Sequence, residues 1–217
     1  NEFFSYIFVI FCMMILINGT NFIDGLNTLV LGYYSIVSVV IIKSEIINEL
    51  NIDSSFFFYW TAILVCLYIF NLFKKLFLGD GGAYLLGFMY GYLLISIYIL
   101  KYEISPFFIV LLLWYPCFEN FFSIIRKYKL KRSPISPDTK HFHQLLFHYI
   151  RRRYLYGNTV SNSLSANIIN LYNLVIFFIG SKDVYNTQLQ LSLILINIFV
   201  YTYLYLKLFI YRYKKNV

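Results

Sequence analysis

Residues 83–100 read AYLLGFMYGYLLISIYIL, and this stretch contains no charged side chain. A helix needs about 20 predominantly apolar residues to cross the hydrocarbon core of a bilayer. Six further apolar segments accompany it, at residues 3–17, 27–42, 56–73, 105–122, 164–180 and 188–210. Because backbone in lipid must satisfy its own hydrogen bonds, we expect all of them to be helices. The sequence therefore predicts an all-α integral membrane protein with about seven transmembrane helices.

The composition excludes an ordinary soluble domain. Hydrophobic residues make up 60% of the chain and charged residues 13%, whereas soluble domains have about 45–50% apolar and about 25% charged residues. The net charge is +8, but the basic residues lie between membrane-length apolar runs and not on a soluble surface. We therefore expect no nucleic-acid partner. Cys12, Cys66 and Cys117 lie in apolar stretches without disulfide or zinc spacing.

The basic residues are distributed unequally between the two sides of the predicted bundle. One side holds the turns near 18–26 and 74–82, the segment 123–163 and the C-terminus. It carries 15 of the 18 Lys and Arg residues, which leaves 3 for the other side. The positive-inside rule makes the basic side cytoplasmic. We expect one polytopic membrane domain over residues 1–217, with 123–163 as a cytoplasmic basic loop.

The first polar motif, NGTNFIDGLN, occupies residues 18–27. Asn18, Asn21 and Asp24 recur at every third residue, so one helical turn places them on one face. A helix cap with polar neighbours is the alternative explanation. Three aligned polar groups exceed what a cap needs, which makes this face a candidate site on the cytoplasmic side.

The second motif, FLGDGGA, occupies residues 77–83. Three glycines around Asp80 allow the backbone to come close to a ligand. The helix that follows presents its N-terminus, which favours phosphate. Asp80 could hold Mg²⁺, which accepts one or two carboxylates and fills its other positions with water and phosphate oxygens. The alternative is a glycine-rich turn between two spans.

The third motif, SPISPDTKHFHQ, occupies residues 133–144. His141 and His143 could bind a metal, but no Cys or second carboxylate completes a zinc set. Arg126, Lys140 and the run 151–153 make a phosphate-binding loop the better interpretation, because Arg binds phosphate bidentately. Orientation and lipid headgroup contact remain the alternative for the arginine run.

Two residues inside apolar segments also stand out. Pro116 could kink the segment 105–122. Glu119, in the same segment, is either functional or a charge that reaches the interface, and the sequence leaves both open.

The three motifs, in this order between apolar helices, resemble those of the polyprenyl-phosphate N-acetylhexosamine-1-phosphate transferases (glycosyltransferase family 4). That family includes the WecA-like enzymes and the MraY translocase, and the likeness is closer to the WecA-like branch. The resemblance implies a phosphotransferase that moves N-acetylhexosamine 1-phosphate from a UDP-sugar to polyprenyl (undecaprenyl) phosphate and releases UMP. It would catalyse the first membrane step of cell-surface glycan assembly, such as cell wall or lipopolysaccharide biosynthesis, at the cell inner (plasma) membrane.

The resemblance also implies a cofactor, partners and residue roles. The cofactor would be Mg²⁺, with Mn²⁺ as an alternative. The partners would be UDP-N-acetylhexosamine, polyprenyl phosphate and membrane lipids, with a homodimer as one option. Asp80 would be the metal ligand, and Phe77 would stack on uracil. The implied catalytic residues are Asp24, Asp80, His141 and His143, and the implied substrate-binding residues are Asn18, Asn21, Asn71, Phe77 and Arg126.

The chain departs from the family pattern in three places. Thr28 stands where the family motif D-G-x-x-G-L often has its second glycine, and Gln144 stands where many members have a third histidine. No Asp-Asp pair occurs in the sequence. In the family this pair lies in an earlier loop, so the resemblance implies that it precedes Asn1, which agrees with a first segment, 3–17, that is shorter than a span. The fragment would then be inactive alone. A membrane transporter or a non-catalytic scaffold is the alternative function.

Overall fold

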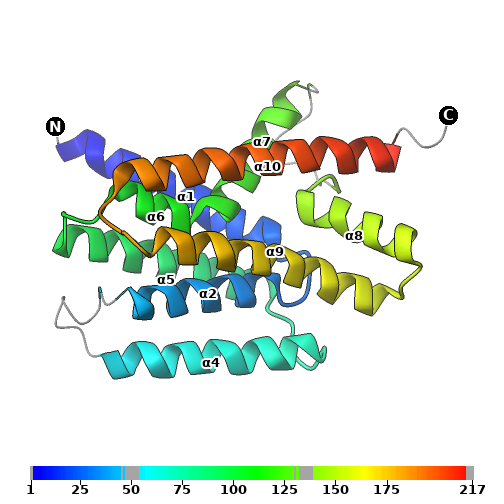
Figure 1. Ribbon diagram of the computed structural model, residues 1–217, viewed down its shortest axis with the longest axis horizontal. Coiled ribbons are helices and arrows are strands. Elements are labelled where there is room, and N and C mark those ends of the chain that lie inside the picture. Colours follow the sequence, from blue (N-terminus) through cyan, green and yellow to red (C-terminus); the bar gives the residue numbers. More distant parts are fainter. Residues whose placement is uncertain (1, 45, 47–53, 130, 132–138, 214–217) are drawn as a thin grey trace.

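The computed structural model describes residues 2–44, 46, 54–129, 131 and 139–213, and the first six residues of the predicted motif 133–144 lie outside them. Within these ranges the regular structure is helical (Figure 1). The helices are α1 (Glu2–Ile23), α2 (Leu29–Lys43), α4 (Ser54–Leu72), α5 (Gly79–Leu100), α6 (Pro106–Leu112), α7 (Trp114–Lys129), α8 (Phe142–Tyr154), α9 (Asn158–Gly180) and α10 (Thr187–Tyr213).

All seven predicted segments are helical. Among the residues that the structure describes, five helices are long and apolar enough to cross a membrane: α1, α4, α5, α9 and α10. The pair α6 and α7 passes the same test as one broken span, and α2 is a shorter apolar helix of 15 residues. The prediction of an all-α integral membrane protein is therefore confirmed. The prediction that the first segment is short is wrong, because α1 has 22 residues and continues through the polar residues 18–21.

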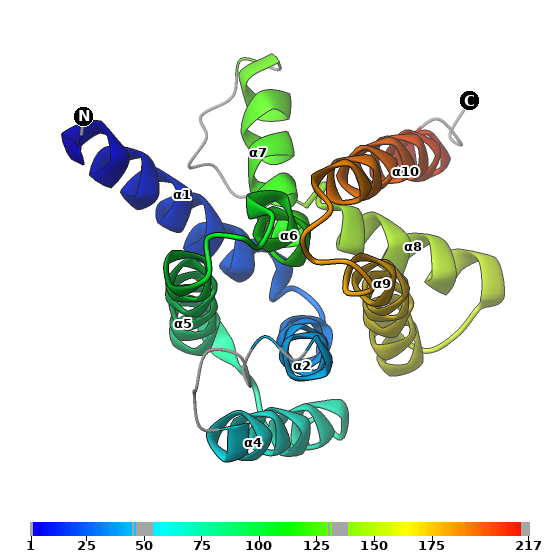
Figure 2. The ribbon, with the colours of Figure 1, turned by 60° about the vertical axis from the view of Figure 1, so that its left-hand side comes forward.

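Helix α2 is short but central. It is apolar on every side, which is the pattern of a buried helix, and most of its residues are buried. It packs against α4 and α9, and Figure 2 shows it between α4, α5 and α9. Helix α2 begins at Leu29, directly after the turn that carries Asp24. The buried α2 therefore anchors the motif 18–27 to the core of the bundle.

The span at 105–122 is broken by 75° between α6 and α7. Pro116 follows in the first turn of α7 and has no N–H to donate to the carbonyl four residues before it. That carbonyl, on Leu112, instead accepts a hydrogen bond from the Tyr33 hydroxyl at 2.9 Å. Helix α1 approaches the same place closely, because a Cβ on Gly19 would lie 2.1 Å from the Pro116 carbonyl oxygen.

The segment 123–163, predicted as a loop, is largely helical. It contains the end of α7, the whole of α8 and the start of α9. Helix α8 packs against α9 and α10. Its apolar residues, among them Phe142, Leu145 and Ile150, are buried, while Arg151, Arg152 and Arg153 are exposed. An amphipathic helix of this kind lies against the bundle with its charged face outward. The C-terminal end of α1, the start of α5 and the start of α8 all lie toward the right-hand end of Figure 1.

Candidate active site

The first two motifs meet through Asp24 and Asp80. Asp24 follows the last residue of α1, and Asp80 lies in the first turn of α5. The Asp24 carboxylate accepts a hydrogen bond from the Gly79 backbone N–H. Burial and then the charge of Asp80 raise the pKa of Asp24 to about 7, against the opposing effect of that hydrogen bond. Two carboxylates held close together at a helix N-terminus favour a bound cation between them.

The glycines of the second motif have different structural reasons. Gly79 has a backbone φ of +66°, which residues other than glycine rarely adopt. A Cβ on Gly81 would meet no atom within 4 Å, so the backbone next to Asp80 borders open space. A Cβ on Gly82 would collide with Leu78. The expectation that a ligand can approach this backbone therefore rests on Gly81.

Three asparagines from other helices hold the turn that follows Asp24. The backbone N–H of Asn27 donates to Asn162 Oδ1 at 2.9 Å. The N–H of Thr28 donates to Asn71 Oδ1 at 2.5 Å, and the Thr28 carbonyl accepts from Asn170 Nδ2 at 3.0 Å. Both asparagines that contact Thr28 are buried. They act as fixed partners for backbone groups that lie outside any helix.

Thr28 also explains a departure from the family motif. Its φ is +70°, which is a strained value for a β-branched residue and favours glycine. The two asparagine contacts hold it in this conformation. The position therefore requires a left-handed backbone, and this chain meets the requirement without the glycine that the motif often has.

Asn71, predicted to bind substrate, has both ends of its amide engaged. Besides accepting from Thr28, it donates from Nδ2 to the Leu76 carbonyl at 2.7 Å. It is 4% exposed. The contacts show that Asn71 connects the Asp24 turn to the chain before Asp80, whereas its contact with substrate stays a prediction.

The histidine motif packs against the first motif. The ring of His141 lies 5.3 Å from that of Phe22 and stacks on His143 at 5.7 Å. His143 is fully buried, and a Cβ on Gly25 would lie 2.5 Å from its Nε2 atom. The structure thus brings His141 and His143 against the turn that carries Asp24.

The imidazole of His143 is buried beside the Asp24 turn. Both of its ring nitrogens are buried without a hydrogen-bond partner in the described residues. Burial, and then the charge of His141, lower the pKa of His143 to about 4, while Glu119 opposes the shift. A neutral imidazole with unsatisfied nitrogens is suited to a polar ligand or water, since buried polar groups are normally hydrogen-bonded.

The other predicted binding residues lie around this centre. Asn21 donates from Nδ2 to the Tyr84 hydroxyl at 3.1 Å, and its Oδ1 is buried without a hydrogen-bond partner among the residues that the structure describes. Asn18 is exposed and donates to the Met14 carbonyl of its own helix at 2.8 Å. Phe77 is 74% exposed, before α5. An exposed aromatic ring beside a glycine-rich backbone is available for stacking.

Arg126 is engaged with the chain that leads into His141. Its guanidinium donates to the Lys140 carbonyl and to the Tyr205 hydroxyl, each at 2.8 Å. Arg212 of α10 similarly donates to the Thr139 carbonyl at 2.8 Å. Both arginines therefore position the histidine segment, and direct binding of phosphate by Arg126 stays a prediction.

Glu119 was left open by the sequence and belongs to this site. It is fully buried on α7, and it accepts hydrogen bonds from His141 and from Tyr201 of α10. Its one sequence signal was a carboxylate within an apolar segment. Tyr201, Asn162 and Asn170 gave no such signal, because their partners come from helices distant in the sequence.

The described residues fit a magnesium ion better than a metal that needs many protein ligands. They contain no group of three or more His, Cys, Asp or Glu side chains that could hold a metal. Mg²⁺ requires only one or two carboxylates, with water and phosphate oxygens as its remaining ligands. Asp80 and Asp24 would supply those carboxylates, and the open space at Gly81 would leave room for the other ligands.

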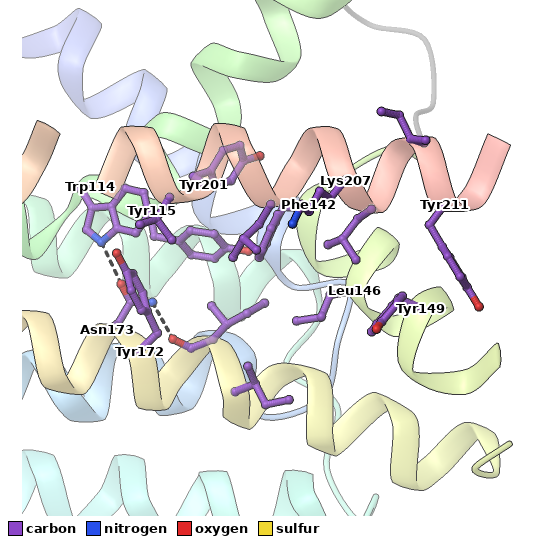
Figure 3. A pocket seen from close by; sticks show the side chains of 16 residues that line it. Trp114, Tyr115, Phe142, Leu146, Tyr149, Tyr172, Asn173, Tyr201, Lys207 and Tyr211 are labelled. Carbon is purple, nitrogen blue, oxygen red and sulfur yellow. Dashed lines mark hydrogen bonds between the residues drawn. The ribbon is translucent and has the colours of Figure 1, made fainter. Parts of the chain in front are cut away.

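A separate cavity of about 600 Å³ lies between α8, α9 and α10 (Figure 3). Its walls are mainly aromatic and aliphatic, and neither Asp24 nor Asp80 lines it. Phe142 and Tyr201 do line it, so it lies behind the histidine segment. Such a lining suits an apolar ligand and not a nucleotide.

Part of the chain is similar in sequence to known proteins. Residues 1–98 match the family model of glycosyl transferase family 4. The chain is 28% identical over 167 residues to an undecaprenyl-phosphate α-N-acetylglucosaminyl 1-phosphate transferase of Thermotoga maritima, a match that covers 76% of this chain and 51% of the relative. It is 28% identical over 155 residues to a decaprenyl-phosphate N-acetylglucosaminephosphotransferase of Mycolicibacterium smegmatis, covering 60% of this chain and 37% of that relative.

No solved structure gives a significant match. The chain spans about half the length of the first relative and little more than a third of the second. The matched residues 1–98 include the first two motifs and both aspartates of the site. Residues 1–98 and the two relatives therefore make the chain similar to glycosyl transferase family 4.

Proposed function

We propose that this chain is part of a WecA-like enzyme that transfers N-acetylhexosamine 1-phosphate from a UDP-sugar to polyprenyl phosphate and releases UMP. One observation carries the proposal: motifs from three separate segments meet at one end of the helical bundle. Asp24 contacts the start of α5 next to Asp80, and His143 packs against Gly25. The names of the two relatives, both N-acetylglucosamine-phosphate transferases, support the reaction class.

The substrates explain the arrangement. Both are anions, and the acceptor lipid is confined to the bilayer. A site at the edge of a membrane bundle can admit the UDP-sugar from water and the lipid phosphate from the side. We place this edge on the cytoplasmic face of the inner (plasma) membrane, because the positive-inside rule assigns the basic side of the chain to the cytoplasm.

The reaction requires orientation of two phosphates and neutralisation of their charge. An oxygen of the lipid phosphate attacks the β-phosphorus of the donor, the bond to the α-phosphate oxygen breaks, and UMP leaves. Mg²⁺, or Mn²⁺ in its place, would be held by Asp80 with Asp24 alongside and would neutralise the diphosphate.

The chain's own groups would do the remaining work. The first-turn N–H groups of α5 favour phosphate. The unpartnered nitrogens of His143 and the Oδ1 atom of Asn21 offer hydrogen bonds to the donor. Phe77, which is exposed beside the same helix start, would stack on the uracil ring.

The chain carries only part of the motifs of the family that it resembles. The family's paired aspartates are absent from this sequence, so we expect no turnover from these 217 residues alone.

The decisive experiment measures UMP release by the full-length protein in detergent with polyprenyl phosphate, Mg²⁺ and UDP-N-acetylglucosamine or UDP-N-acetylgalactosamine. Asp80→Asn should abolish release, because the neutral amide is a poor magnesium ligand. Asp183→Asn, in an exposed turn, is the control and should keep wild-type activity. Near-normal turnover by Asp80→Asn would overturn the metal assignment, and no release with any UDP-N-acetylhexosamine would overturn the function.

A further inference from the structure

The carboxylate of Glu119 connects three elements of the site. It is 0% exposed and lies on α7. Its Oε1 atom accepts from His141 Nδ1 at 2.9 Å and from the Phe142 backbone N–H at 3.2 Å. Its Oε2 atom accepts from the Tyr201 hydroxyl at 2.8 Å. Both oxygens are therefore engaged, by the start of α8 and by α10.

A buried carboxylate is costly unless it is paired and hydrogen-bonded. Other polar contacts already hold the start of α8, since Arg126 and Arg212 bind the carbonyls of Lys140 and Thr139. A role in packing alone would not require a charge at Glu119. Its contact with a histidine ring is the part of the arrangement that has chemical consequences.

That contact determines which ring nitrogen of His141 carries the proton. An ionised carboxylate can only accept hydrogen bonds, so His141 Nδ1 must donate. In the neutral ring, Nε2 is then left as an acceptor, and in the protonated ring it is a second donor. The same contact fixes the plane of the ring, which stacks on His143 with 12° between the planes.

We propose that Glu119 is a positioning residue, which holds His141 in the Nδ1–H form and orients the His141–His143 pair toward the Asp24 turn. It touches no substrate and acts through His141. The inference rests on the proposed function for its catalytic consequence, but not for the state of the His141 ring. The sequence alone left the role of Glu119 open.

The kinetic test is a double-mutant cycle in the full-length protein with Glu119→Gln, His141→Ala and the double variant. Removing the hydrogen-bond partner that orients a functional histidine typically lowers activity about 10–100-fold. We expect a loss of this size in kcat for Glu119→Gln, with KM for the UDP-sugar nearly unchanged. In the His141→Ala background the same change should cost little more, because the two residues act as one unit.

Tyr172→Phe is the matched control. It removes a hydrogen bond between α9 and α10, donated to Asn197 Oδ1 at 2.7 Å, and leaves the contact between Glu119 and His141. We expect a lower unfolding temperature and a kcat close to that of the wild type. An equal loss for Glu119→Gln in both backgrounds, or wild-type kcat in Glu119→Gln, would overturn the proposal, because the effect would then not pass through His141.

A second measurement needs no turnover. In ¹⁵N-histidine-labelled protein, the His141 signals are assigned by comparison with His141→Gln, and His148 serves as an internal reference. We expect wild-type His141 to carry its proton on Nδ1 and Glu119→Gln to shift that signal without moving His148. An Nε2–H tautomer in the wild type refutes the proposal even if every variant fails to fold. If no UDP-sugar supports release, the proposed function fails, and this spectrum still decides the role of Glu119.

Discussion

Asp24→Asn should make the protein more stable while it removes activity. The pKa of Asp24 is raised from 3.8 to about 7 by burial and by the charge of Asp80. The folded state therefore favours the protonated form. The stability that this preference contributes is complete below pH 3.8 and is lost as the pH rises toward 7. Above pH 7 the ionised carboxylate destabilises the fold, and an asparagine does not.

The magnitude follows from the size of the shift. A shift from 3.8 to about 7 corresponds to roughly 4 kcal/mol at about 1.36 kcal/mol per unit. Because the side chain is partly exposed, solvent screening reduces this to about 1–2 kcal/mol. For a chain of this size that equals about 2–8 °C in unfolding temperature. At pH 5 the gain should shrink to well under half, because Asp24 is then protonated in the folded protein.

The assay is thermal unfolding in detergent with EDTA at pH 8 and pH 5, followed by tryptophan fluorescence at one scan rate. Asp183→Asn is the control, since it changes an exposed aspartate in the same way. UMP release is measured in parallel at pH 8 with Mg²⁺. A variant that is no more stable than the wild type at pH 8, or that gains equally at both pH values, would refute the electrostatic argument. Stability gained with loss of function is the trade-off expected of a catalytic residue.

Three further predictions concern other parts of the structure. Gly81→Ala should fold at least as well as the wild type, because the added Cβ meets open space and alanine favours the helix by about 1 kcal/mol. The same variant should raise KM for the UDP-sugar. Gly157→Ala also adds a Cβ in open space and is the control, which should leave KM and kcat unchanged. Tyr33→Phe should destabilise the bundle by about 1–3 kcal/mol in thermal or denaturant unfolding, because it leaves the Leu112 carbonyl without a partner in the bend; Tyr6→Phe, an exposed control, should not. The 217-residue chain alone should release no UMP from UDP-N-acetylhexosamine and polyprenyl phosphate, because it lacks the aspartate pair of the family that it resembles; measurable release would contradict a requirement for that pair.

The sequence predicted the helices well where hydropathy decides them. All seven apolar segments are helical, because backbone in an apolar medium has few other ways to satisfy its hydrogen bonds. It was less successful where a helix continues through polar residues. Helix α1 continues through the polar residues 18–21, α5 starts at Gly79 in place of 83, and α8 lies inside the segment predicted as a loop. Helix ends and amphipathic helices depend on neighbours that a hydropathy pattern does not contain.

The candidate site was predictable only in part. Asp24, Asp80, His141 and His143 could be selected because carboxylates, glycines and histidines stood out between apolar runs. Their convergence could not, since the contact between Asp24 and the start of α5 joins residues that are distant in the sequence. Asn71 was selected as a ligand contact, and the structure adds that it holds the backbone of Thr28.

By itself, the sequence determined that the protein is helical and apolar enough for a membrane, and which polar motifs it carries. These properties follow from local composition, because each helix satisfies its own backbone. Only the tertiary structure decided that three asparagines hold the Asp24 turn and that Glu119 accepts a hydrogen bond from His141. It also decided that the ring nitrogens of His143 are buried without a partner in the described part of the chain. Hydrogen bonds and burial between distant segments depend on how the helices pack, and no periodicity along one segment encodes that packing.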